Sequence, residues 1–236
     1  MSIVLAIETS TQESSCALWV RDQWQEIWLD PAVPSSQSLL PAVQGLLADA
    51  GVTWSQLDGI AFGAGPGAFT GLRVACGVTQ GLAVAHDLPV VGIETLAALA
   101  WSAFNENVTA TECLTALDAR MNEIYYARYQ RAGASLRRMG EIRVAPPAAV
   151  EVPEQGWIAG NAQRAYPAFA TRVAHLSSFP ESLHACCIPS AQAIGILGQQ
   201  AFERGEGGAA ETALPIYVRD KVAQTVAERL AQGGKA

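Results

Sequence analysis

Two acidic residues of this 236-residue chain stand at the ends of predicted strands, where a carboxylate could do chemistry. Glu8 closes the first apolar run, and Thr9, Ser10 and Thr11 follow it directly. In a phosphate site, the N–H and hydroxyl groups of such a turn would hold the phosphate while the carboxylate orients a cation through water. The alternative is an ordinary hairpin whose hydroxyls satisfy the turn backbone. Spacing alone favours the hairpin and leaves the phosphate site open.

A glycine-rich segment, 63–67, follows the predicted strand 57–62 and precedes a predicted helix over 70–86. Gly65 and Gly67 would let the backbone approach a ligand, and the N–H groups at Thr70 would favour an anion. The segment lacks the lysine of a P-loop, because the chain's only lysines are Lys221 and Lys235. A tight strand-to-helix connection explains the glycines equally well.

The second acidic residue, Asp118, ends the predicted strand 114–117 and begins a polar hairpin tip with Arg120 and Glu123. These three side chains could recognise a ligand or pair with one another across the turn. The three histidines, at 86, 175 and 184, form no H-x-x-x-H pair, so a helix-borne metal site is not expected.

Composition and charge argue against several classes of function. A net charge of −7 opposes autonomous binding to nucleic acid, and no apolar run is long enough to span a bilayer. The first residues do not resemble a signal peptide, and the five cysteines are odd in number, which suggests reduced thiols. We therefore expect a soluble cytoplasmic protein.

The predicted elements indicate an α/β fold in which one unit occurs twice. Three strands over 4–29 precede helices at 38–50, 70–86 and 94–104, with strands at 57–62 and 89–93 between them. The order restarts near residue 113 with strands at 114–117, 123–130, 138–144 and 157–160, and a last helix at 190–204. We predict an N-terminal lobe over 1–105 and a smaller C-terminal lobe over 106–236 that ends in a flexible tail. The packing of the last helix stays open.

Two of these helices carry unusual stripes. The helix 38–50 has an apolar stripe, with Ser38 as N-cap, Pro41 in the first turn and Gly51 after its end. In the helix 70–86, Gly77, Gly81 and Ala85 recur every four residues. Because glycine costs a helix about 1 kcal/mol relative to alanine, close packing should compensate. Packing within the domain is slightly favoured over an intermolecular helix contact.

Four segments together resemble one family. They are Ala-Ile-Glu-Thr-Ser-Thr at 6–11, Gly-Pro-Gly-Ala-Phe-Thr-Gly-Leu-Arg at 65–73, Asp-Ala-Arg-Met-Asn-Glu-Ile-Tyr at 118–125 and Pro-Ile-Tyr-Val-Arg at 215–219. In this order, over nearly the whole chain, they are similar to the TsaB (YeaZ) family. The resemblance implies a two-lobed actin/Hsp70/sugar-kinase-like (ASKHA) fold with a reduced second lobe. It also implies a non-catalytic part in making threonylcarbamoyladenosine next to the anticodon of tRNA.

The resemblance further implies partners. In the family, the subunit pairs with the catalytic paralogue TsaD through helices of the first lobe, and the ATPase TsaE joins the pair. A homodimer forms when the subunit is alone, and tRNA is met only through the complex. The partner-binding residues implied here are Leu39, Val43, Leu46, Leu47, Ala50, Thr70, Arg73, Val74, Gly77, Val78, Gly81 and Ala85.

The same resemblance implies no intrinsic cofactor, with ATP or ADP at a partner interface as the alternative. The residues implied for that nucleotide site, vestigial or shared, are Glu8, Thr9, Ser10, Thr11, Gly65, Gly67, Asp118 and Arg120. The chain departs from the family pattern at Ala64 and Ala68, which weakens the case for nucleotide bound by this lobe alone. The rival functions are an active kinase or ATPase, a metallo-endopeptidase and a homodimeric scaffold without a tRNA role.

Overall fold

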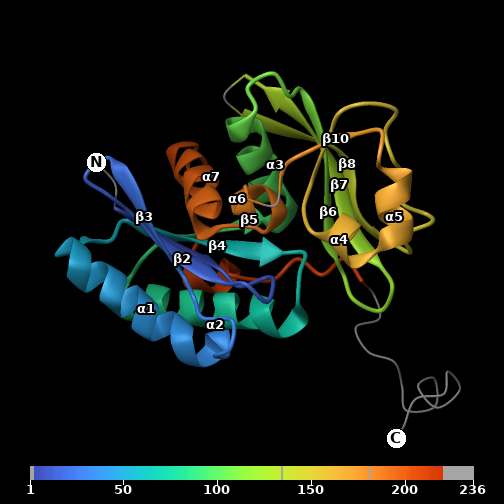
Figure 1. Cartoon of the computed structure of the whole chain (residues 1–236). Coiled ribbons are helices and arrows are strands. Elements are labelled where there is room, and N and C mark those ends of the chain that lie inside the picture. The colour runs from blue at the N-terminus through green and yellow to red at the C-terminus, as the bar shows by residue number, and fades with distance from the viewer. Residues whose placement is uncertain (1–2, 134, 181, 220–236) are drawn as a thin grey trace, which may run out of the picture.

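The structure, a computed structural model, describes residues 3–133, 135–180 and 182–219. It has two lobes, each built on a five-stranded mixed sheet (Figure 1). The predicted flexible tail at the end of the chain lies outside the described residues. No helix within the described ranges is long and apolar enough to cross a membrane. Cys16, Cys76, Cys113 and Cys186 are free thiols, and all four are buried.

The first sheet has the order β3-β2-β1-β4-β5. The strands β1 (Val4–Glu8), β2 (Ser15–Val20) and β3 (Gln23–Trp28) form the predicted antiparallel meander, and β4 (Gly59–Gly65) and β5 (Val90–Glu94) run parallel to β1. Leu5 and Ile7 pack on the side of helices α1 (Ser35–Ala50) and α2 (Phe69–His86). Val4 and Ala6 pack on the opposite side, so β1 is buried on both faces.

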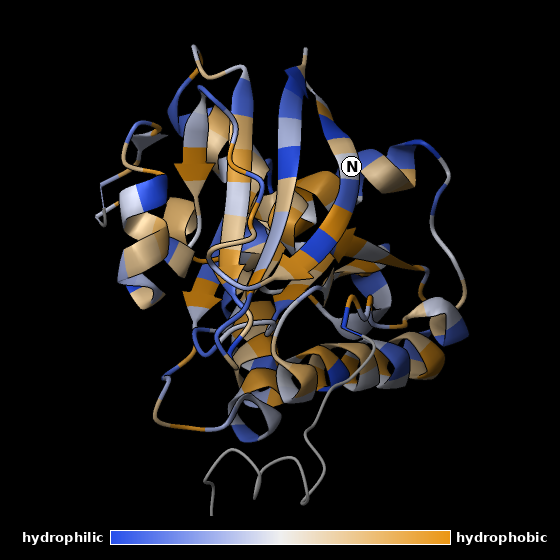
Figure 2. Cartoon of the chain, turned by 90° about the vertical axis from the view of Figure 1, so that its right-hand side faces the viewer, coloured by the Kyte–Doolittle hydropathy of each residue, from blue (hydrophilic) through white to orange (hydrophobic). Residues whose placement is uncertain are grey.

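The second sheet repeats this topology in the order β8-β7-β6-β9-β10. Its strands are β6 (Glu112–Asp118), β7 (Ile124–Ala132), β8 (Ser135–Ala145), β9 (Trp157–Ala159) and β10 (Ser177–Ser178). Residues 146–156 contain no helix, whereas α1 stands at the equivalent place in the first lobe. The long strands alternate hydrophilic and hydrophobic residues (Figure 2). The duplication expected from the element order is confirmed by the shared topology of the two sheets.

The last long helix crosses back to the first lobe. Helix α7 (Ala191–Glu203) packs on β1, β2 and β4, opposite α1 and α2 (Figure 1). Glycines permit this approach, since a Cβ at Gly198 would lie 2.3 Å from the Cβ of Ala61. Helix α3 (Thr95–Glu106) packs chiefly on the second sheet. A division at residue 105 thus separates the two sheets but not the helices that cover them.

Some predicted boundaries were wrong. Helix α1 begins three residues earlier than expected, and Pro34 rather than Ser38 occupies the N-cap position. Pro41 therefore lies in the second turn, where its missing N–H leaves the carbonyl of the exposed Gln37 to solvent. Gly51 ends the helix in the left-handed conformation as predicted. No local pattern predicted the short helices α4 (Ala162–Ala165), α5 (Pro167–Arg172) and α6 (His184–Cys187).

Candidate functional site

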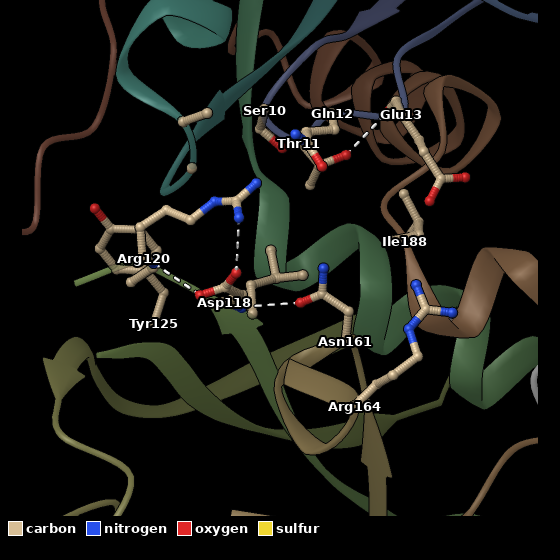
Figure 3. A pocket seen from close by; sticks show the side chains of 14 residues that line it. Ser10, Thr11, Gln12, Glu13, Asp118, Arg120, Tyr125, Asn161, Arg164 and Ile188 are labelled. Atoms are coloured by element: carbon tan, nitrogen blue, oxygen red, sulfur yellow. Dashed lines mark hydrogen bonds and ion pairs between the residues drawn. The ribbon is translucent and has the colours of Figure 1, made fainter. Parts of the chain in front are cut away.

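A pocket of about 130 Å³ lies where the two lobes meet (Figure 3). The first lobe contributes the turn between β1 and β2 and the start of α2, and the second lobe contributes the end of β6 and the start of α4. Its polar lining comes from Ser10, Thr11, Gln12, Glu13, Asp118, Arg120, Asn161 and Arg164. Clefts that enclose a drug-sized ligand usually have about 300–1,000 Å³. The pocket is smaller than such a cleft.

Glu8 lies behind this pocket and does not line it. Its side chain is fully buried, and its Oε1 accepts a hydrogen bond from the N–H of Ser10 at 2.5 Å. Its Oε2 has no hydrogen-bond partner and packs against Gly63, where an added Cβ would lie 2.0 Å from that oxygen. Desolvation by burial raises the pKa of Glu8 to about 7. A carboxyl group in this position supports the turn.

Two of the three hydroxyl groups of the same turn donate to backbone carbonyls. Thr9 Oγ1 donates to the carbonyl of Gly71 at 2.7 Å, and Thr11 Oγ1 donates to the carbonyl of Glu13 at 2.7 Å. The Ser10 hydroxyl is buried without a partner. Two of the three hydroxyl groups are thus engaged by backbone carbonyls, one in the turn itself and one on α2.

The glycines of the predicted loop serve the packing of this turn against α2. Gly65 belongs to the end of β4 and has a φ of 116°, which favours glycine. A Cβ at Gly67 would lie 2.5 Å from the Cβ of Ser10, and one at Gly71 would lie 1.8 Å from the carbonyl oxygen of Thr9. These contacts favour the tight strand-to-helix connection.

Asp118 reaches the pocket, but its carboxylate is already engaged. Tyr166 donates its hydroxyl to Oδ1 at 2.5 Å, and the N–H of Arg120 donates to the same oxygen at 2.8 Å. The Arg120 guanidinium lies 3.6 Å from Oδ2, and the side chain of Asn161 accepts from the Asp118 N–H (Figure 3). Burial and this bond to Asp118 raise the pKa of Tyr166 to about 12. These contacts engage the carboxylate in ordering the second lobe, so it is not arranged to bind a substrate.

The alternative of pairing across the hairpin tip is met in part. Arg120 pairs with Asp118, whereas Glu123 bonds to Arg219 from the C-terminal part of the chain. Sequence reasoning missed Asn161 and Tyr166, because they follow a short strand with no motif around them. Among the described residues, no group of three or more His, Cys, Asp or Glu side chains could hold a metal ion.

The predicted partner-binding residues of α1 and α2 differ in their exposure to solvent. Leu39, Val43, Leu46, Leu47 and Ala50 are all buried in the core beneath α1. This corrects the prediction for these five, because the apolar stripe packs on its own sheet and has no surface for a partner. The accessible face of α1 instead includes Leu40 and Gly45.

On α2 the small-residue stripe faces solvent. Thr70, Arg73, Gly77, Gly81 and Ala85 are exposed, and a Cβ at either glycine would meet nothing within 4 Å. The slightly favoured interpretation, packing within the domain, was wrong. The remaining predicted residues, Val74 and Val78, are half-buried beside the stripe.

The chain is similar in sequence to proteins of one known family. Residues 32–226 match a family model described as "TsaD: tRNA N6-adenosine threonylcarbamoyltransferase". A relative from Escherichia coli, "tRNA threonylcarbamoyladenosine biosynthesis protein TsaB", is 34% identical over 226 residues, which cover 93% of this chain and 96% of the relative. The chain belongs to the TsaB (YeaZ) family. A TsaB from Haemophilus influenzae is 42% identical over 54% of both chains.

Solved structures agree with this membership. The TsaB-family structure "YeaZ from Pseudomonas aeruginosa" is 39% identical, has a TM-score of 0.80 and covers 92% of this chain and 100% of its own. Component A of the (R)-2-hydroxyglutaryl-CoA dehydratase of Acidaminococcus fermentans reaches a TM-score of 0.50 at 6% identity and so shares the fold alone. The predicted two-lobed ASKHA fold is confirmed for this TsaB-family chain.

Proposed function

We propose that this chain is a non-catalytic subunit of the complex that forms threonylcarbamoyladenosine next to the anticodon in tRNA. Its part is to bind and support the catalytic subunit TsaD through the outer face of α2. The relatives supply the pathway, since TsaB of E. coli is a tRNA threonylcarbamoyladenosine biosynthesis protein. The exposed surface of α2 supports the proposed mode of action, which is binding to TsaD.

The observation that carries this proposal is an exposed helix face almost without charge. Along α2, Arg73 is the only formally charged residue, and the neighbouring helix α1 carries only Asp49. Protein surfaces usually have about 25–35% charged residues, and the centres of protein interfaces are depleted of them. Gly77 and Gly81 leave a bare strip in which the backbone of a partner helix could approach closely. Val84, 75% exposed, extends this strip as an apolar contact.

The interlobe cleft supports the non-catalytic part of the proposal. A kinase would need a free carboxylate and a phosphate grip there, but Glu8 is buried and Asp118 is engaged by Tyr166 and Arg120. We propose that the chain has no resident cofactor and that any ATP or ADP in the complex is held at an interface with a partner. The complex would work in the cytoplasm, with TsaE joining the pair and tRNA bound through TsaD.

A reconstituted reaction tests this function. Purified TsaD and TsaE from the same organism, tRNA and threonylcarbamoyl adenylate are incubated with and without the chain, and the modified nucleoside is measured by mass spectrometry. We expect product only when the chain is present, and no ATP turnover by the chain alone. Product formation without the chain would contradict the proposal, and ATP hydrolysis by the isolated chain would favour the kinase.

The homodimeric scaffold is the second candidate, because the same face would also fit a second copy. We propose that the homodimer is the form of the chain in the absence of TsaD. Adding TsaD should then convert the homodimer into the mixed pair, since both partners compete for α2.

A further inference from the structure

A larger pocket, of about 320 Å³, lies in the second lobe beside the interlobe pocket. It is bordered by the ends of β9 and β10 and by α4, α5 and α6, and we call it the β9–β10 pocket. Its volume falls within the range of about 300–1,000 Å³ that is usual for small-molecule sites. The pairing proposed for α2, in the first lobe, makes no use of it.

The topology of the second sheet accounts for the position of this pocket. Strands β6, β9 and β10 run parallel, and Gly160 and Phe179 line the pocket just beyond the carboxyl ends of β9 and β10. In open α/β sheets, ligands usually bind outside the carboxyl ends of the strands. Strands β9 and β10 have three and two residues, whereas the equivalent β4 and β5 have seven and five. The pocket occupies part of the space beyond these short strands.

Part of the pocket lining is apolar and preformed. Val173 and Leu176 belong to the core on the α5 side of the second sheet, and Phe179 belongs to the core on its α3 side. The ring of Phe179 packs against Trp157, with the ring centroids 4.7 Å apart. Because these side chains are buried and packed in the cores, an apolar ligand would meet a fixed surface.

The polar part of the lining contains one cation and no carboxylate. Within the part of the chain that the structure describes, the Arg164 guanidinium forms no ion pair or hydrogen bond (Figure 3). The other polar side chains that line the pocket, those of Asn161, Gln163 and Ser178, are uncharged. The β9–β10 pocket thus combines an apolar surface with a guanidinium that is available to a ligand.

This combination fits a small organic acid. A guanidinium binds a carboxylate through two parallel N–H···O bonds. A phosphate ester carries a charge of about −1.5 to −2 at neutral pH, which one arginine in a chain of net charge −7 would balance only in part. A carboxylate carries the single negative charge that Arg164 can match.

We propose that the β9–β10 pocket binds a small monocarboxylate with an apolar body, whose carboxylate pairs with Arg164 and whose body packs against Leu176 and Phe179. The site lies within the second lobe and needs no residue of a partner. The proposal is independent of the tRNA pathway, since it concerns binding by this chain alone.

Calorimetric titration of the full-length chain with three aromatic or aliphatic acids tests the binding. The probes are indole-3-acetate, 4-phenylbutyrate and hexanoate, and at least one should bind saturably. Indole-3-acetamide has an apolar body without the charge, and acetate has the charge without the body. Each should bind at least about tenfold more weakly than the best acid, because it lacks one of the two contacts.

Three variants locate the site. Arg164→Gln removes the guanidinium and should weaken binding of the acid at least about tenfold. Arg120→Gln makes the same change in the interlobe pocket, which Arg120 lines without lining the β9–β10 pocket, and should leave the affinity unchanged. Ala170 is half-buried on α5, and Ala170→Phe should fill the β9–β10 pocket and abolish binding. Circular dichroism checks the fold of each variant.

The outcomes separate the two pockets. Absence of saturable binding by all three acids overturns the proposal, as does unchanged affinity in Arg164→Gln. Binding that is lost in Arg120→Gln but kept in Ala170→Phe would assign the acid to the interlobe pocket, which also overturns it. If Ala170→Phe does not fold, the difference between Arg164→Gln and Arg120→Gln still decides, because only the first of these two should lose affinity.

Discussion

Glu8 makes the stability of this chain depend on pH in a way that can be calculated. Its carboxyl group is fully buried, one oxygen has no partner, and burial raises its pKa from 4.5 to about 7. In the unfolded chain the group loses its proton near pH 4.5, whereas in the folded chain it keeps the proton to about pH 7. The unfolded state therefore binds fewer protons between these values, and the free energy of unfolding falls as the pH rises.

The magnitude follows from the difference between the two pKa values. One pKa unit corresponds to about 1.4 kcal/mol, so the loss between about pH 5 and pH 8 is on the order of 2–3 kcal/mol. Glu8→Gln resembles the protonated side chain and cannot lose a proton. Relative to the wild type, it should become more stable by this amount as the pH rises across that range.

Urea denaturation of both proteins at several pH values measures this difference directly. Glu26 is present in both proteins and its charge also raises the pKa of Glu8, so the comparison reports Glu8 together with its coupling to Glu26. Glu141→Gln, which removes an exposed carboxylate on β8, is the matched control and should follow the wild type. Parallel stability curves for the wild type and Glu8→Gln would refute the assignment of a buried, protonated Glu8.

The remaining predictions concern packing and the interlobe hydrogen bonds. Gly198→Leu should lower the free energy of unfolding by about 1–3 kcal/mol in urea, because its side chain would collide with Ala61 below α7. Gly45→Ala on the open face of α1 should instead raise it by about 0.5–1 kcal/mol, and destabilisation there would show that the site is crowded. Tyr166→Phe should cost about 1 kcal/mol through the lost bond to Asp118, and the cost should vanish in an Asp118→Ala background.

Much of the fold could be predicted because local signals agreed with the final packing. The repeated order of strands and helices appears as two sheets with the same topology, and Gly51 ends its helix as expected. The start of α1 was placed too late because Ser38 has the chemistry of an N-cap, although the helix already begins at Ser35. Local preference cannot show that the preceding turn is also helical.

The candidate site was predictable only in part, for a physical reason. The segments at 65–73 and 118–125 do lie together, but their side chains mostly support the chain itself. Periodicity finds which residues share a helix face, yet it does not say which way the face points. The apolar stripe of α1 packs in the core, whereas the glycine stripe of α2 faces solvent. Only the tertiary structure determines whether such a stripe is buried or exposed.

The central claim is that the bare face of α2 binds the catalytic subunit. Purified chain and TsaD from the same organism are mixed, and the mass of the complex is measured by size-exclusion chromatography with light scattering. Gly81→Arg places a long charged side chain in the bare strip. Ala168→Arg makes the same change on an exposed position of α5, in the other lobe.

We predict a one-to-one pair for the wild type and for Ala168→Arg, and no pair for Gly81→Arg, with all three proteins folded by circular dichroism. A pair that survives Gly81→Arg, or a wild-type chain that stays a homodimer beside TsaD, would contradict the account.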